Sequence, residues 1–186
     1  TFARFFYAAP FAAAIALGYL GWQGQGVPGL GGVFWAYVLI GGLAQILATW
    51  CVVALFAERN FAVGITFKKT EVVQTALVGF VILGDRVSMA GLMAILVGLV
   101  GVLVLSDTPA SGHWSRRFVN RAAGLGLASG ACFAISAVAY RGATLEVASE
   151  DAFLRAMLSV AAVTAAQSIA MALWLRWREP GQLGRV

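Results

Sequence analysis

Long stretches without a single charged residue limit this chain more than any other feature of its sequence. Such stretches cover residues 5–57, 87–106, 122–140 and 156–175. Each of the last three is close to the ~20 residues that cross a ~30 Å hydrocarbon core as one helix. The first is long enough for two crossings and is interrupted by the turn-rich segment 23–32. Because the runs are continuous rather than short and alternating, they favour membrane helices over a β-barrel.

The composition agrees with these runs. Soluble domains usually carry about 25% charged and about 45–50% apolar residues, whereas this chain has 11% and 61%. The predicted fold class is therefore all-α, a polytopic bundle of helices in a lipid bilayer.

Loop arginines that orient the spans account for the net charge of +5, so no nucleic-acid partner is expected. Cys51 and Cys132 lie in apolar runs as packing residues, and His113 is the single histidine, so we expect no metal and no other cofactor.

The pattern predicts six spans, at about residues 3–22, 33–57, 61–83, 88–106, 121–141 and 152–177. Short connections make most successive helices antiparallel neighbours. Arginines gather in alternate connections: one side holds Arg4, Arg59, Arg116, Arg117, Arg121, Arg176, Arg178 and Arg185, and the other holds Arg86, Arg141 and Arg155. The arginine-rich side is expected to be cytoplasmic, which places loop 107–120 and both chain ends inside.

A short internal similarity accompanies this arrangement. Phe2-Ala3-Arg4 opens the first span and Phe153-Leu154-Arg155 opens the sixth, and both then run into apolar helices that are rich in small residues. Five crossings separate the two copies, so they point in opposite directions across the membrane. Inverted repeats of this kind are a common plan of secondary transporters.

The third span contains charges that an apolar span should not have. If it begins near residue 61 on the cytoplasmic side, a rise of 1.5 Å per residue puts Lys68 roughly 10 Å and Glu71 roughly 15 Å deep. Central charges cost about 2.5–3.5 kcal/mol each on insertion scales. The polar stripe of this helix consists of Lys68, Glu71, Gln74 and Thr75, and the opposite side consists of Val72, Val73, Ala76 and Phe80, with Lys69 at its edge.

Three interpretations of these charges stay open. The stripe is a substrate or proton site in a cavity between the repeats, or Lys68 and Glu71 neutralise each other and lock helices together, or the helix is shallow and its charges lie near the interface. Because intramembrane ionisable residues are expensive, the first interpretation is the leading hypothesis.

Neighbouring spans supply candidate walls for such a cavity. The second span offers Gln45, Thr49 and Trp50, the fifth offers Tyr140, and the sixth offers Arg155 one turn inside its start, where it is placed to meet an anionic group. Hydrogen bonds between helices are the alternative explanation for each polar residue. The small residues Gly91, Ala94, Gly98 and Gly101, and the pair Gly126 and Gly130, are at spacings that let membrane helices approach closely.

Several motifs, taken in order, resemble the drug/metabolite transporter superfamily in its EamA-like branch. They are Lys69-Thr70-Glu71-Val72-Val73-Gln74, Leu83-Gly84-Asp85-Arg86-Val87-Ser88, the spaced glycines Gly91 and Gly98 with Gly101-Val102, the opening Ala3-Arg4-Phe5-Phe6 with Pro10, and the segment from Ala123-Gly124 to Tyr140-Arg141. The resemblance covers most of the chain. Two features depart from the family pattern, namely the charged Lys69-Thr70-Glu71 and the expected cytoplasmic position of loop 107–120.

The resemblance implies ten helices in two inverted five-helix repeats around a central cavity. Residues 1–106 would then hold helices two to five of the first repeat, 107–120 the loop between repeats, and 121–186 the first two helices of the second repeat, so that the chain is expected to be a fragment. The expected location is the plasma membrane, in bacteria the inner membrane. A homodimer is compatible with this plan.

The leading functional hypothesis is a secondary transporter of small organic metabolites or drugs, with export as the expected direction and the proton as a candidate coupling ion. An integral-membrane enzyme is one alternative, but one loop histidine and few central ionisable residues argue against it. A helical subunit that packs against partners without transporting anything is the other.

Overall fold

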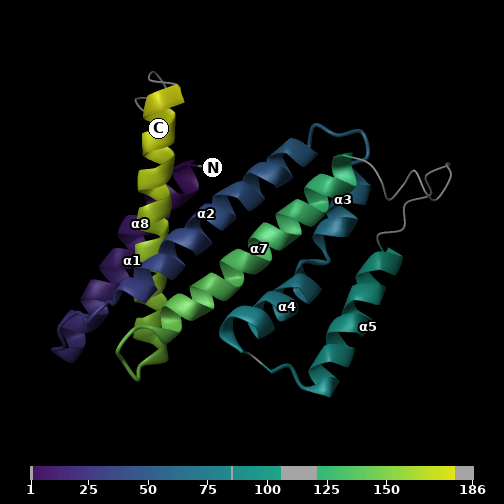
Figure 1. Ribbon diagram of the computed structural model, residues 1–186. Helices are drawn as coiled ribbons and strands as arrows, with labels where there is room; N and C mark the ends of the chain where they lie inside the picture. Colours follow the sequence, from purple (N-terminus) through teal and green to yellow (C-terminus); the bar gives the residue numbers. More distant parts are fainter. Residues whose placement is uncertain (1, 85, 106–120, 179–186) are drawn as a thin grey trace. The chain divides into compact units, whose positions relative to one another are not determined.

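The computed structural model describes residues 2–84, 86–105 and 121–178, and within them the chain is all-α (Figure 1). The helices are α1 (Phe2–Gln23), α2 (Gly32–Leu55), α3 (Phe61–Lys68), α4 (Glu71–Leu83), α5 (Met89–Leu105), α7 (Arg121–Leu145) and α8 (Ala152–Arg178). Loop 107–120 and Arg185 lie outside the described residues, so their predicted positions are untested.

Within the described ranges, four helices are long and apolar enough to cross a membrane. They are α1 from Arg4, α2, α7 and α8, and they confirm the predicted helices at 3–22, 33–57, 121–141 and 152–177 to within a few residues at each end. The chain is thus compatible with a multi-pass membrane protein. The predicted span at 88–106 is a helix, α5, but its apolar stretch Met89–Gly101 is shorter than the other four.

The prediction of one helix over 61–83 is wrong. The chain ends α3 at Lys68, makes a turn at residues 69–70, and begins α4 at Glu71. The reason lies in the carbonyl of Phe67, which accepts both the N–H of Thr70 at 3.1 Å and the Thr70 hydroxyl at 2.7 Å. Both bonds span three residues, and such a tight turn interrupts the regular i→i−4 ladder.

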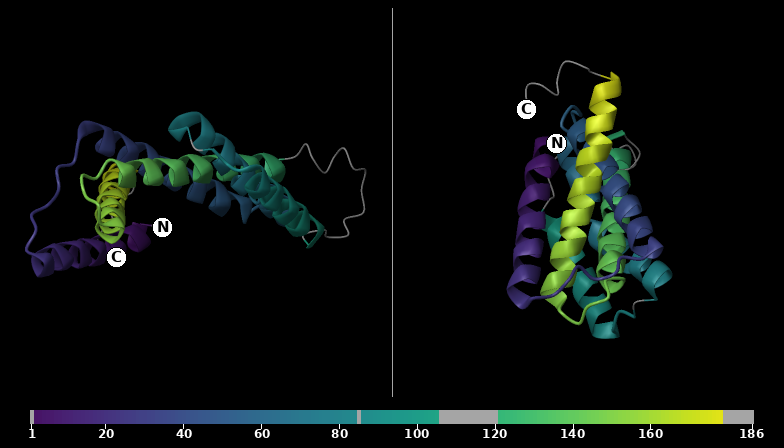
Figure 2. Two further views of the ribbon diagram at one scale, coloured as in Figure 1. Left: turned by 90° about the horizontal axis from the view of Figure 1, so that it is seen from below. Right: turned by 90° about the vertical axis from the view of Figure 1, so that its left-hand side faces the viewer.

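The described chain forms two compact units. The first comprises Thr1–Leu43 and Ala139–Val186. In it α1 runs along α8 (Figures 1 and 2), and the core gathers Phe34 and Val38 of α2, Ala143 of α7, and Leu154 and Leu158 of α8. An isolated antiparallel bridge joins Leu30 to Val147 beside this core.

The second unit comprises Ala44–Val138. It holds the rest of α2, all of α3, α4 and α5, and most of α7. The hydroxyl of Ser129 on α7 donates to the carbonyl of Ala48 on α2 at 3.3 Å. At the turn between α2 and α3, the rings of Phe56 and Phe61 stack with centroids 5.0 Å apart.

Glycine at Gly126 lets α7 approach α3 closely, as the Gly126–Gly130 spacing predicts. A Cβ at Gly126 would collide with the backbone carbonyl of Gly64, and a Cβ at Gly64 would lie 2.7 Å from the carbonyl of Ala122. On α5 the matching expectation is not met within the described residues, because Gly98 and Gly101 have no atom within reach of an added Cβ.

Candidate functional site

The charged segment forms an ion pair at the break between α3 and α4. Nζ of Lys68 donates to Oε2 of Glu71 at 2.7 Å. Lys68 lies in the last turn of α3 and Glu71 in the first turn of α4, so each charge is favourable at its own helix end. The two side chains are 26% and 29% exposed. Two opposite, half-buried charges therefore lie where two short helices meet.

Further polar groups continue from this pair along α4. Gln74 donates from Nε2 to the hydroxyl oxygen of Thr70 at 2.8 Å, while its Oε1 is buried and has no hydrogen-bond partner among the described residues. We call Lys68, Thr70, Glu71 and Gln74 the junction cluster. It combines an ammonium group, a carboxylate and an unused amide acceptor within two turns of chain.

Helix α7 packs against one side of the junction cluster. The Lys68 ammonium lies 4.6 Å from the centroid of the Phe133 ring, a cation–π contact. A Cβ on Gly130 would lie 3.3 Å from Oε1 of Gln74 and 3.3 Å from the carbonyl oxygen of Lys68. The glycine therefore provides the space in which the Gln74 amide and the end of α3 lie beside α7.

The other predicted site residues of the second unit play less direct parts. Thr75 and Thr49 each donate to the backbone carbonyl four residues earlier at 2.8 Å, so their hydroxyls are engaged within their own helices. Gln45 is half-buried on α2. Lys69 is exposed, and so is the Trp50 ring at 69%. The structure does not bring these two side chains into the junction cluster.

Tyr140 and Arg155 belong to the first unit. The Tyr140 hydroxyl accepts a hydrogen bond from Nε2 of Gln167 at 3.0 Å, and the same nitrogen lies 3.2 Å from the carbonyl of Gly42. Nε of Arg155 and the hydroxyl of Ser159, one turn apart on α8, are buried without a hydrogen-bond partner among the described residues. Arg155 and Ser159 are four residues apart and therefore lie on one face of α8.

Two further polar contacts of the first unit join helices that are distant in the sequence. Gln167 is only 1% exposed and links α8 to α2 and α7. Asp151 accepts the Tyr19 hydroxyl at 2.6 Å and caps α8, since its Oδ1 accepts the N–H groups of Phe153 and Leu154 at 2.8 and 3.2 Å. An aspartate directly before an apolar helix is an N-cap signal that the sequence offers, whereas its partner Tyr19 is 132 residues away.

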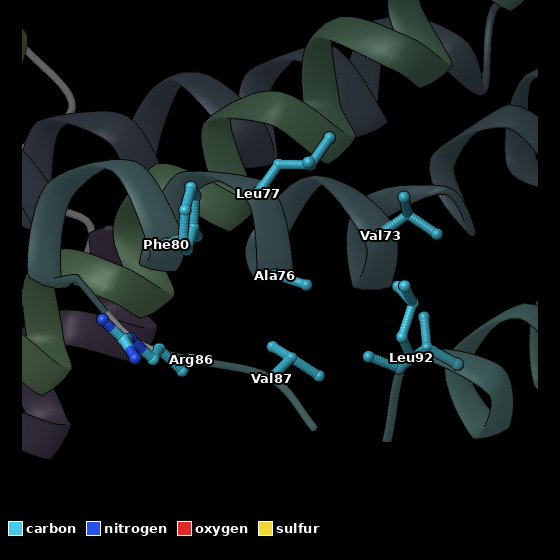
Figure 3. A pocket seen from close by; sticks show the side chains of 8 residues that line it. Val73, Ala76, Leu77, Phe80, Arg86, Val87 and Leu92 are labelled. Carbon is cyan, nitrogen blue, oxygen red and sulfur yellow. The ribbon is translucent and has the colours of Figure 1, made fainter. Parts of the chain in front are cut away.

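A cavity of about 580 Å³ lies between α4 and α5 (Figure 3). Its walls are Val73, Ala76, Leu77 and Phe80 of α4, Leu92 and Ile95 of α5, and Val87 and Arg86 of the turn between them. The volume falls in the range of ~300–1,000 Å³ that is usual for small-molecule sites. Its α4 wall includes Val73, Ala76 and Phe80 of the predicted apolar side, and neither Gln74 nor another residue of the junction cluster is among the described lining residues.

The described residues also limit the chemistry that the chain supports. They include no group of three or more histidine, cysteine, aspartate or glutamate side chains that could hold a metal ion. The chain matches no protein-family model, no curated protein and no solved structure. Its function must therefore be inferred from the residues and their geometry.

Proposed function

We propose that this protein is a membrane secondary transporter that moves small organic metabolites or drugs by alternating access, in the manner of the EamA-like transporters that its motifs resemble. The observation that carries the proposal is the helix break at residues 69–70 with the Lys68–Glu71 pair across it. Transporters commonly build their substrate and ion sites from interrupted helices, whose free ends provide partial charges inside the membrane.

The break itself favours a site over a simple lock. Lysine and glutamate three residues apart can already pair on the surface of an unbroken helix, so pairing alone does not require α3 to end at Lys68. The side chain of Thr70, the residue before α4, makes no capping hydrogen bond to this helix. The N-terminal end of α4, which carries a partial positive charge, and the unused Oε1 of Gln74 are then available to a solute that enters beside the pair.

In this proposal Glu71 is the residue that responds to the transported species. When Glu71 binds a proton or a cationic group of the solute, it no longer balances Lys68. Lys68 then keeps its cation–π contact with Phe133, and the two short helices are released from their shared ion pair. Binding at Glu71 thereby breaks the ion pair between α3 and α4. Alternating access requires such a coupling, in which the bound species favours one conformation over the other.

The test is the substitution Glu71→Gln in the full-length protein reconstituted into liposomes. It keeps the shape of the side chain and removes the charge. We expect flux of two probes, ethidium and a mixture of amino acids followed by mass spectrometry, to fall to the level of empty liposomes. Glu58→Gln is the matched control, because Glu58 pairs at 3.3 Å with the exposed Arg121 outside the junction cluster, and it should retain full flux.

Elution of Glu71→Gln as a single, unaggregated species separates loss of transport from loss of folding. A well-folded Glu71→Gln protein with unchanged flux would contradict the role of Glu71. If the wild-type protein moves neither probe, transport of these solute classes is contradicted as well.

The lock interpretation makes the opposite prediction for a double substitution. Replacing Lys68 by Met and Glu71 by Leu removes both charges, and a pair that only holds helices together is often replaced by apolar residues at little cost. If the pair only holds helices together, the double variant keeps its fold and the flux of the wild-type protein. The transport proposal instead expects the double variant to be folded and to have lost that flux.

A further inference from the structure

The cavity between α4 and α5 is separate from the junction cluster. On α4, Gln74 lies beside Gly130 of α7, whereas the cavity is lined by Val73, Leu77 and Phe80 of the same helix (Figure 3). Their spacing of four and three residues places them on one helix face. The cavity therefore needs an occupant of its own, whatever passes through the junction cluster.

Water is a poor occupant. Seven of the eight lining residues are apolar, and a water molecule needs two to four polar partners to be held in a cavity. The cavity is also open to its surroundings, since the Phe80 and Leu92 side chains at its walls are 60% and 39% exposed. Helices α4 and α5 are themselves apolar and belong to a chain that carries candidate membrane spans, so lipid is the medium expected at these walls.

Arg86 gives the cavity one charged end. Helix α4 ends at Leu83, and Gly84 adopts a left-handed conformation with φ of 68°, after which the chain turns toward α5. Arg86 follows in this turn and is exposed, and among the described lining residues it is the only charged one. A guanidinium group binds phosphate oxygens in a bidentate geometry and is suited to the headgroup level of a membrane.

We propose that this cavity binds an anionic phospholipid, with one acyl chain between α4 and α5 and the phosphate group on Arg86. A polar metabolite would find almost no hydrogen-bond partners on these walls. A helix of another protein would need a longer groove, because α5 contributes only Leu92 and Ile95, within a single turn. An acyl chain matches the apolar walls, and an anionic headgroup matches Arg86.

The experiment uses photoreactive phospholipids in bilayers that contain the purified full-length protein. Phosphatidylglycerol and phosphatidylcholine carry the same diazirine-labelled acyl chain, and the adducts are mapped by peptide mass spectrometry. We expect adducts on residues 73–95 to favour phosphatidylglycerol. Arg86→Gln should reduce that preference about fivefold, the factor expected for one arginine near an anionic surface.

Further variants test where the acyl chain lies and whether the lipid preference depends on Arg86 in particular. Ala76→Trp, or Ile95→Trp from the opposite wall, fills the cavity and should abolish adducts of both lipids in this segment. Arg59→Gln removes an exposed arginine in the turn between α2 and α3, which does not line the cavity, and should leave the lipid preference on residues 73–95 unchanged.

Three results would overturn the proposal. Equal labelling by both lipids would make this region an ordinary lipid-facing surface. Labelling that persists when either tryptophan fills the cavity would place the acyl chain elsewhere. An absence of adducts of either lipid on residues 73–95 would show that no phospholipid occupies the cavity. None of these results depends on whether the protein transports a solute.

Discussion

At the scale of single residues, Asp151 joins two helices that are far apart in the sequence. One carboxylate oxygen caps α8, and the other accepts the Tyr19 hydroxyl at 2.6 Å and lies 3.3 Å from Nε2 of Gln23. The Tyr19 hydroxyl and the N–H groups of Leu154 and Phe153 together hold the pKa of the Asp151 carboxyl below its ordinary value of 3.8. Hydrogen bonds to the ionised form have this effect.

The lowered pKa predicts how this contact depends on pH. The ionised form of Asp151 has more partners in the folded protein than in the unfolded chain, so its stabilisation is complete above the ordinary pKa and is lost as the pH falls through the lowered one. We expect the melting temperature of the wild-type protein in detergent to exceed that of Asp151→Asn at pH 7, and the difference to shrink below about pH 4.

Glu150→Gln is the matched control for this measurement. Glu150 precedes Asp151 and is exposed, so its substitution should follow the wild-type melting profile at every pH. A difference between wild type and Asp151→Asn that stays constant from pH 7 to pH 3 would show that the charge of Asp151 does not stabilise the fold.

How much the sequence predicts at this scale differs between residues. Lys68 and Glu71 attract attention because they are charges in an apolar segment, and their pairing follows from a spacing of three residues. Gln167 is an uncharged residue in a helix of 27 residues, and no local pattern distinguishes it from the other polar residues of that helix. Its contacts with Tyr140 and Gly42 depend on how three helices pack, which a single sequence does not contain.

At the scale of elements, the glycines of α7 decide how closely it approaches α3. Gly126 is buried against the backbone of Gly64, whereas Gly124 is exposed and has no atom within 4 Å of an added Cβ. Gly126→Ala must displace backbone rather than a flexible side chain, so we expect it to destabilise the protein by about 1–3 kcal/mol, as overpacking does. Thermal or denaturant unfolding in detergent measures the difference.

Gly124→Ala is the control for the intrinsic effect of alanine in the same helix. It should be neutral or stabilise by up to about 1 kcal/mol, because alanine is the better helix former. If the two variants have the same stability, α7 and α3 do not pack through Gly126 in the folded protein.

The break between α3 and α4 shows what hydropathy does not predict about elements. Residues 61–83 are apolar enough to suggest one span, and the polar stripe fits one continuous helix. A different signal is present in the same residues, since Lys68 suits the C-terminal end of a helix and Glu71 suits the N-terminal end of the next. The charged residues of the four long helices all lie near a helix end, as Arg141 does in α7 and Arg155 in α8, and the predicted positions of these helices are confirmed.

At the scale of the whole molecule, the central question is whether the segment from α3 to α5 crosses the membrane. At 1.5 Å per residue, α3, α4 and α5 have lengths of about 12, 20 and 25 Å, each less than a hydrocarbon core of ~30 Å. The orientation inferred from arginine counts requires α3 and α4 together to make one crossing, with residue 59 inside and residue 86 outside. A re-entrant path would leave both residues on one side.

Cysteine labelling distinguishes these two paths. In a full-length background with Cys51→Ala and Cys132→Ala, single substitutions Arg59→Cys and Arg86→Cys are treated with a membrane-impermeant maleimide in intact cells, and Gln25→Cys in the connection between α1 and α2 is the outside reference. We expect labelling at residues 25 and 86 and none at residue 59 until the membrane is opened. Labelling at residue 59 alone would mean that the whole arrangement is inverted, and loop 107–120 would then lie outside, in agreement with the EamA-like pattern. Protection of both residues 59 and 86 would establish a re-entrant segment. The ion pair would then lie near one surface of the membrane, and the proposed transport site would lose its central position.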